Sequence, residues 1–515
     1  MRRCVLDRTG HGLVFLGSCL LCTATTLHAD DAASTDPAED AAVLPDVVVS
    51  SGKRDRDAQD VPASISVVDS QDLELTAGRS LVDATALAPN VIVQNQGGRT
   101  STYFYTRGIG RSELNFPIVS VNVNGVALPD PAFFGLDLDA AEQVEFLRGP
   151  QGTLYGQNTL GGVINIRLRE PGEVFAGSAE LLAGERDFRE VAVRLEGPLG
   201  TDKVRAAGTV LWNDIDGFVD NPTRDESQNP EKTLGASLYL VAEPNADTRV
   251  TLNYFGQDRD DGLVQYAQGE DDFEIVNDTK TFEEVRSDVW GISLSYDLGH
   301  GRVESQTGWV VGDRFTQNDT DFTAAPLITS TADVDIGQWS QELRYLSDNG
   351  GALDYVVGLY GSGLSNDFDV YINDLAGVTG LEMPVQIRDL VLFDDLTLAA
   401  FGQANWRVGR WEVVGGLRYH TQKVETDNSN SIVALGADGP GDTLLPEAQL
   451  VAEHDFSAWL PRVGATYAVN PDLKLYTSAS RGFRAGGFNN TALTAARLGI
   501  DLPQAYDPEY TWNYE

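Results

Sequence analysis

Residues 148–156 combine an arginine with closely spaced glycines, a pattern that could bind an anion through backbone N–H groups. The segment reads RGPQGTLYG and continues as GQNTLGG through Gly162. A nest of such N–H groups can hold a phosphate, but this stretch lacks the lysine of a phosphate-binding loop. We therefore expect glycines that permit tight turns and close backbone contacts, and no nucleotide site.

Histidine and cysteine offer little further chemistry. All three cysteines lie before residue 23, and only His300, His420 and His454 follow residue 29. We expect His300 in a turn, His420 at a strand end and His454 on a long loop. His454 could bind a metal or haem, but a solvated loop histidine is the preferred interpretation. No nucleophile, base and orienting group occur together, so the sequence predicts no enzyme, no cofactor and no metal.

Acidic residues dominate the charge of the chain, which is −40 for 515 residues. This charge argues against nucleic acid as a partner, because phosphate binding needs concentrated lysine and arginine. Residues 258–288 are especially acidic and could bind Ca²⁺ through Asp258, Asp260 and Asp261. A hydrated, self-repelling surface is the preferred interpretation of that segment.

The N-terminal segment has the features of a secretory signal peptide. A basic start precedes the apolar run 13–27, and cleavage is expected after Ala29, so residues 1–29 are removed. Residues 30–57 are small, acidic and proline-containing at first, and are expected to form a flexible leader. Within it, residues 46–50 read DVVVS. This β-branched run could add a strand to another protein, or it could be the edge strand of the following domain, which composition alone favours.

Two domains must follow this leader. Residues 58–170 mix short strands with two short helices, at 70–77 and 80–87, each with a serine N-cap. Residues 171–515 alternate strands with turns throughout. Short turns alternate there with long polar segments at 213–232, 260–287, 314–335, 363–395 and 425–455, which is the pattern of a bacterial outer-membrane β-barrel. Thirteen strands are expected and a fourteenth begins near Tyr510, so we expect a chain that ends inside its barrel.

Several motifs together resemble those of the TonB-dependent outer-membrane receptors. The 148–166 segment is similar to the signature of that family's plug domain, and LAPNV at 87–91, TRGI at 106–109, GLRY at 416–419 and SRGFRAGGFN at 480–489 are also similar. The resemblance covers residues 46–515. It implies an all-β transmembrane antiparallel barrel of 22 strands, about 13–14 of them present, with an N-terminal α/β plug domain inside, in the outer membrane of a Gram-negative bacterium.

The resemblance also assigns expected roles to residues. It implies that Asp46, Val47, Val48, Val49 and Ser50 form the Ton box, the segment bound by periplasmic TonB. It makes Arg148 a structural residue that pairs with barrel carboxylates. The plug signature comprises Arg148, Gly149, Pro150, Gly152, Tyr155, Gly156, Gly161 and Gly162. Arginine and aromatic groups near the plug apex suit an anionic iron chelate, and the expected substrate contacts are Arg99, Tyr103, Tyr105, Arg107, Arg111 and Asn115.

The resemblance implies uptake of a ferric siderophore or another small nutrient, driven through TonB by the inner-membrane proton gradient. Oligosaccharide and cobalamin remain alternative substrates, and outer-membrane lipid is the expected surroundings. Two other classes of protein stay open. A non-transporting adhesin or porin would need no plug and no Ton box, whereas a secreted carbohydrate enzyme would need paired carboxylates in a cleft.

Overall fold

A computed structural model describes the chain from Val48 to Glu515 with short gaps. Asp46, Val47 and everything before them lie outside the described residues. The internal residues that are not described are 51, 96, 100–101, 111–116, 265–272, 349–350, 376–382, 437–438, 472, 490–491 and 498.

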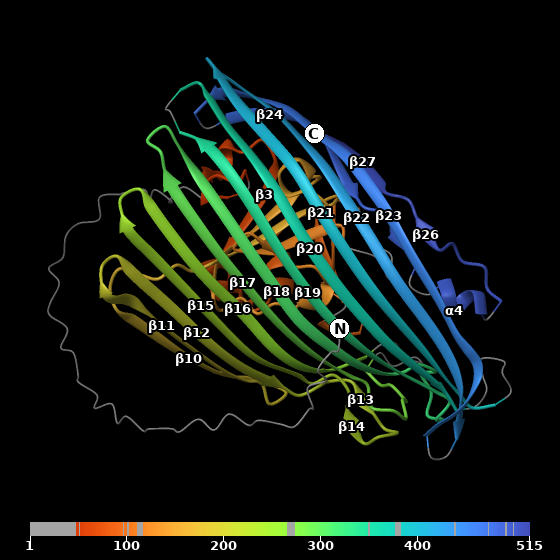
Figure 1. Ribbon diagram of the computed structural model, residues 1–515. Coiled ribbons are helices and arrows are strands. Elements are labelled where there is room, and N and C mark those ends of the chain that lie inside the picture. The colour runs from red at the N-terminus through yellow and green to blue at the C-terminus, as the bar shows by residue number, and fades with distance from the viewer. Residues whose placement is uncertain are drawn as a thin grey trace, which may run out of the picture. The chain divides into compact units, whose positions relative to one another are not determined.

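One antiparallel sheet of fourteen strands forms most of the molecule, as the sequence predicts (Figure 1). Each strand pairs with the next large strand along the chain, and β10 and β27 lie at the two edges of the sheet. The strands are β10 (Ala176–Ala183), β11 (Arg189–Thr201), β12 (Val204–Ile215), β15 (Glu231–Asn245), β16 (Thr248–Gly262), β17 (Phe282–Asp297), β18 (Gly301–Asp319), β19 (Ile328–Ser347), β20 (Leu353–Asp374), β21 (Val385–Val408), β22 (Trp411–Gly436), β23 (Gly439–Asn470), β24 (Leu473–Arg484) and β27 (Glu509–Tyr514).

Of the five polar segments expected as loops, 213–232 and 260–287 lie mostly between strands, whereas strands continue through most of 314–335, 363–395 and 425–455. β21, β22 and β23 run 24, 26 and 32 residues, so most of 363–395 and 425–455 is paired strand. Strand pairing uses backbone N–H and C=O groups, so polar side chains do not end it. Loss of apolar alternation therefore marked the end of the apolar band and not the end of the strand.

Side chains on the sheet alternate between an inner and an outer face. In β22 the outward residues Trp411, Val413, Leu417 and Tyr419 are exposed, whereas Arg418 between the last two is buried. Aromatic pairs bracket this apolar run: Trp411 contacts Tyr467, and Tyr419 contacts Trp459. An apolar outer band with aromatic girdles is the surface that a membrane-spanning barrel presents to lipid.

The second domain is built on a five-stranded mixed sheet in the order β3-β8-β9-β6-β7. β6 and β9 pair in parallel, and the other neighbours are antiparallel. The elements of this domain are β3 (Ser64–Asp69), α1 (Ser70–Thr76), α2 (Leu81–Thr85), β4 (Val91–Asn95), β5 (Thr102–Thr106), β6 (Val119–Val123), β7 (Val126–Ala127), a 3₁₀ turn η3 (Pro131–Phe133), β8 (Ala141–Arg148), α3 (Gly152–Tyr155) and β9 (Gly162–Leu168).

Both expected helices form, with one change of cap. α1 begins after Asp69, whose carboxylate accepts from Asp72 N at 2.8 Å, so Asp69 and not Ser70 is the N-cap. Ser80 caps α2 as expected, and Asp83 completes a capping box. A carboxylate accepts a hydrogen bond from a helical N–H more strongly than a hydroxyl does, which favours Asp69 over Ser70 as the N-cap.

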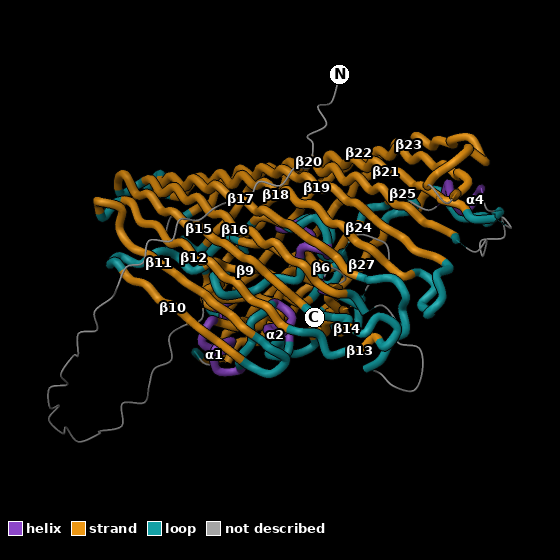
Figure 2. Tube along the Cα trace, turned by 90° about the horizontal axis from the view of Figure 1, so that it is seen from below, coloured by secondary structure: helices purple, strands orange, loops and turns teal. Residues whose placement is uncertain are grey.

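The plug domain packs against the inner face of the barrel sheet (Figure 2). Its apolar core is continuous with Phe255, Val289 and Val310 of the wall strands β16, β17 and β18. Gly312 of β18 leaves room for the Phe133 ring, because a Cβ there would lie 2.5 Å from the ring edge. The two domains therefore share one core, and the wall fixes the position of the plug.

Smaller elements connect these domains and extend the loops. They are β1 (Val48–Val49), β2 (Arg56–Asp57), η1 (Ala58–Asp60), β13 (Asp220–Asn221), β14 (Glu226–Ser227), β25 (Gly487–Phe488), α4 (Ala492–Arg497) and β26 (Ala505–Tyr506). No helix among the described residues is both long enough and apolar enough to cross a membrane.

The apolar outer band generates a stability prediction. Leu417→Arg is expected to lower the free energy of unfolding by on the order of 2 kcal/mol in lipid vesicles, because a charge is placed on the outward face between the two aromatic pairs. Ser429→Arg, on the same face of β22 but beyond Tyr419, is expected to cost about 0–1 kcal/mol. Denaturant titration in vesicles measures both, and equal losses would contradict an apolar, lipid-facing band.

Candidate functional site

The plug signature lies at the boundary between plug and wall. Its short helix α3 contacts β21, β22, β23 and β24 of the barrel. Thr153 Oγ1 donates to the Leu460 carbonyl at 3.0 Å, and Gln151 accepts from Arg462 at 2.9 Å. Gly152 needs its small size, since a Cβ there would lie 3.0 Å from the Arg481 carbonyl oxygen. The segment expected to be structural thus docks the plug onto the wall.

Among the described residues Arg148 forms no salt bridge with a barrel carboxylate, contrary to the expectation. Its guanidinium donates to Ser64 Oγ at 2.9 Å, to Ser66 Oγ at 2.8 Å and to the Pro89 carbonyl at 2.6 Å, all within the plug. Because β8 and β3 are antiparallel neighbours, the Arg148 side chain reaches the serines of β3 more easily than the wall. Arg148 therefore ties β8, β3 and the segment after α2 together.

Gly156 contacts a buried wall arginine. Its φ of 89° and ψ of −133° fall in a region that only glycine adopts readily. A Cβ at this position would lie 2.8 Å from one Arg418 guanidinium nitrogen. Conformation and space both require glycine here, so the signature residue and Arg418 form one packed unit.

The segment expected to be the Ton box pairs with the residues that follow it. Val49 is fully buried, and β1 pairs antiparallel with β2. Ser50 N donates to Glu145 Oε1 of β8 at 2.9 Å, and Gln143 of the same strand donates to the Val48 carbonyl at 3.0 Å. The described part of the segment is therefore hydrogen-bonded directly to β8.

Basic residues that follow this segment attach it to the wall. Lys53 Nζ lies 3.3 Å from Glu342 Oε2, and Arg56 Nη1 lies 2.9 Å from Glu412 Oε1. Arg54 donates to the carbonyls of Ser347 and Tyr355. Burial lowers the pKa of Lys53, and the Glu342 carboxylate opposes that effect. The sequence analysis did not single out Glu145 or Glu342. In the sequence each of them is only an acidic residue within an expected strand.

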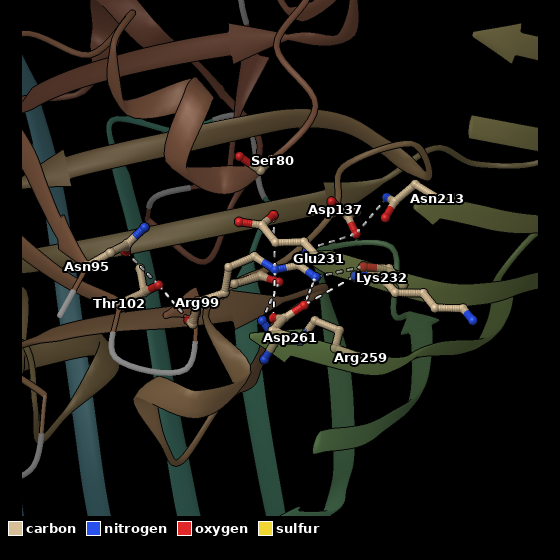
Figure 3. Close-up of polar contacts among 12 residues, drawn as sticks. Ser80, Asn95, Arg99, Thr102, Asp137, Asn213, Glu231, Lys232, Arg259 and Asp261 are labelled. Atoms are coloured by element: carbon tan, nitrogen blue, oxygen red, sulfur yellow. Dashed lines mark hydrogen bonds and ion pairs between the residues drawn. The ribbon is translucent and has the colours of Figure 1, made fainter. Parts of the chain in front are cut away.

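Arg99 forms an ion-pair cluster with the wall near the start of β15 and the end of β16 (Figure 3). Its guanidinium contacts Asp261 through two hydrogen bonds, of 2.9 and 2.5 Å, and Thr233 Oγ1 at 3.1 Å. Burial alone would lower the pKa of Arg99, but the Asp261 carboxylate beside it raises that pKa above its usual value. A bidentate pair of this kind is strong and directional. Direct binding of a substrate by Arg99 would require it to leave Asp261.

In the same cluster the wall also donates hydrogen bonds to the plug. Arg259 of β16 donates to the plug carbonyls of Ala132 and Gly135. Burial raises the pKa of Asp137, which lies 3.8 Å from Arg99. Burial and the neighbouring Asp137 charge raise the pKa of Asp139 to about 6. Carboxylates therefore crowd the plug surface here, and Arg99 offsets only part of their repulsion.

The other expected substrate contacts are dispersed. Tyr103 and Tyr105 lie on β5, half-buried, and Tyr105 Oη donates to Gln94 Oε1 at 2.7 Å. Arg107, in the left-handed region at φ 52°, bonds Glu515 at 2.7 Å. Arg111 and Asn115 lie outside the described residues. The described arginines of this set thus already have carboxylate partners.

The histidines differ from two expectations. His300 occupies the β17–β18 turn as expected, whereas His420 is fully buried inside β22 and His454 is exposed within β23. Strand continuation through the polar segments explains both corrections. Of the acidic residues considered for Ca²⁺, Asp261 is bonded to Arg99. A different group of acidic residues, Asp278, Asp319 and Asp321, brings carboxylate oxygens within 4.8 Å of one another. The backbone N–H of Asp278 donates to Asp319, and that of Ile328 donates to Asp321.

Comparison with known proteins agrees with this architecture. Residues 190–515 match the TonB dependent receptor-like β-barrel family, and residues 57–163 match the TonB-dependent receptor plug domain. The pesticin receptor of Yersinia pestis is 23% identical over 499 residues, covering 91% of this chain and 67% of the relative. The vitamin B12 transporter BtuB of Vibrio vulnificus is 29% identical over 193 residues, covering 37% of this chain and 29% of the relative.

Solved structures show the same fold. The ferric yersiniabactin uptake receptor FyuA from Yersinia pestis superposes with a TM-score of 0.76 at 20% identity, covering 88% of this chain and 69% of that one. The ferric citrate transporter FecA superposes with a TM-score of 0.67 at 14% identity, covering 89% of this chain and 68% of that one. This chain spans about two thirds of the length of these structures.

A plug domain docked onto the inner wall of an outer-membrane β-barrel sheet defines a class of receptors. The chain belongs to the TonB-dependent receptor family. The curated relatives are receptors and transporters and not enzymes.

Gly156 gives a direct test of the packed unit with Arg418. Gly156→Ala is expected to lower the free energy of unfolding by about 1–3 kcal/mol, since alanine is strained at this backbone conformation and meets the guanidinium. Gly200→Ala is the matched control, because Gly200 also has a positive φ but nothing within 4 Å of its Cβ position. Thermal or denaturant unfolding in detergent compares them, and equal losses would refute the contact with Arg418.

Asp139 gives a pH-dependent prediction. Its folded pKa of about 6 exceeds the ordinary value of 3.8, so the folded state binds the proton more tightly than the unfolded state. The contribution of Asp139 to stability is therefore greatest below about pH 4 and is lost as the pH rises through 6. Asp139→Asn should raise the melting temperature at pH 7.5 and not at pH 4. Asp202→Asn, in an exposed turn, should do neither, and a rise at both pH values would contradict the assignment.

Proposed function

We propose that this chain acts as an energised outer-membrane transporter. A nutrient binds on the outer side of the plug, TonB binds residues 46–50, and a pull on that segment rearranges the plug. The observation that carries this proposal is the contact of Val48 and Ser50 with Gln143 and Glu145 of β8. β8 ends at Arg148, the start of the plug signature, so force on the segment would act on the strand that leads to the plug–wall contact.

The Ton box has a weak partner that TonB could replace. β1 pairs with only two residues of β2, and the Val48 side chain is 40% exposed. An extended segment can exchange such a short pairing for a strand of another protein, gaining backbone hydrogen bonds there. Lys53 and Arg56 would remain bonded to the wall and would set where the extended segment begins to move.

A ferric siderophore is the substrate we propose. An iron-regulated outer membrane virulence protein of Vibrio cholerae is 28% identical over 227 residues, covering 41% of this chain and 33% of the relative. Arginine and tyrosine on the plug suit anionic or aromatic chelates. Arg99, Tyr103, Tyr105, Arg107, Arg111 and Asn115 remain proposed contacts, with Arg99 and Arg107 needing to exchange their carboxylate partners first.

Cobalamin is a second candidate substrate, because the matched segment of the vitamin B12 transporter BtuB is 29% identical, compared with 28% for the iron-regulated protein. A passive porin or adhesin is less well supported. The plug core is continuous with the inner wall, and such proteins would not need a plug or a segment poised for TonB.

Uptake by living cells tests the proposal. Cells carrying the gene with Val48→Pro are expected to lose uptake of radiolabelled ferric siderophore and to keep surface binding, because proline removes a strand donor. Val48→Thr is the control, since it keeps the N–H group and β-branching and should keep uptake. Uptake is measured with and without a proton uncoupler.

The possible results separate energy coupling from substrate choice. Uptake that persists in the Val48→Pro cells would overturn the TonB-coupled mechanism. Absence of siderophore binding, together with cobalamin uptake that depends on Val48, would retain the mechanism and replace the substrate.

A further inference from the structure

A polar cavity lies between the plug and the inner face of β20, β21 and β22. Its volume is about 60 Å³. The plug contributes residues from two segments, 117–129 and 155–158, and the wall contributes inward-facing side chains. Polar lining residues include Ser120, Gln157, Asn158, Ser362, Thr397 and His420, together with Arg418.

Arg418 brings a positive charge to this cavity without a partner for two of its nitrogens. The residue is 1% exposed, and its Nε and Nη1 have no hydrogen-bond partner within the described part of the chain. Glu342 is a carboxylate whose charge reaches Arg418, but it already bonds Lys53 and Arg344. Buried charges are normally paired, since desolvation of a lone ion is costly.

Aromatic rings hold the Arg418 guanidinium in place but do not satisfy it. Its Cζ lies 5.2 Å from the Tyr360 ring centroid and 5.6 Å from that of Phe401, and Gly156 covers another side. Cation–π contacts attract the cation to the rings but supply no oxygen or nitrogen acceptor for its N–H groups. Nε and Nη1 therefore lack such an acceptor among the described residues.

His420, on the same strand and the same face, adds a ring N–H donor. It is fully buried, neither ring nitrogen has a hydrogen-bond partner among the described residues, and its ring contacts Phe483. The cavity's own carboxylate, Asp395, is already bonded by Gln422 and Thr397. The hydrogen bonds of Asp395 thus come from neutral side chains and not from Arg418 or His420.

We propose that Arg418 and His420 form an internal binding site for a small oxyanion at the plug–wall boundary. The planar guanidinium fork matches carboxylate and phosphate oxygens bidentately. Hydroxyl and amide groups of Ser362, Gln157 and Asn158 can complete the shell. A free inorganic oxyanion and a carboxylate carried by an organic solute share this chemistry. The site does not depend on which nutrient the receptor takes up.

Thermal unfolding of the detergent-purified receptor tests the site. Sodium phosphate, compared with sodium chloride at equal ionic strength, should raise the melting temperature saturably. Arg418→Met, which keeps an apolar stem beside Tyr360 and Phe401, should abolish that rise, and His420→Gln should reduce it. Arg481→Met is the matched control, because Arg481 also lies over an aromatic ring, that of Tyr510, but does not line the cavity.

A parallel titration with sodium acetate distinguishes the two sources. A rise that needs Arg418 in phosphate alone assigns a free inorganic oxyanion, and a rise in acetate assigns a carboxylate. Selenate soaked into crystals of the unaltered protein covers the case in which Arg418→Met does not fold, and an anomalous selenium peak beside Arg418 supports the proposal. The absence of that peak, together with no anion-dependent rise or one that Arg418→Met retains, would overturn it and leave Arg418 a structural residue.

Discussion

The alternation of side chains along the barrel strands constrains everything inside the sheet. An apolar outer face requires the inner face to carry the polar residues of strands such as β22, so the plug meets a wall rich in charge. Several of these groups pair with the plug, since an unpaired buried ion destabilises the fold. Arg99 with Asp261, and Arg259 with the carbonyls of Ala132 and Gly135, are the result.

The plug is consequently held by two different kinds of contact. Apolar residues of its core pack against β16 to β19, and ionic contacts lie around that patch. Apolar burial is non-directional and tolerates small shifts, whereas bidentate ion pairs fix orientation. A plug attached in this way can stay in place without ligand and still rearrange when a few directional bonds break, as the proposed pull through β8 requires.

Two glycines of the plug signature lie at this boundary. Gly156 packs on Arg418, and Gly152 on the backbone of β24. The sequence predicted close backbone contacts in this segment and ion pairs between Arg148 and the wall, whereas Arg148 donates to Ser64 and to the Pro89 carbonyl within the plug. The contact with Gly156 also fixes the place of the Arg418 guanidinium, which lines the cavity between plug and wall.

The sequence by itself determined the family, the plug and the antiparallel strands, because motifs, turn residues and alternation are local properties. It located β27 near Tyr510 and both plug helices for the same reason. Tertiary structure alone decided the length of β21 to β23, since pairing with a neighbour can extend a polar strand that shows no pattern of its own. It also decided the partners of Arg99, Arg148 and Arg418, because contacts between residues far apart in sequence depend on register and packing, which no local pattern encodes.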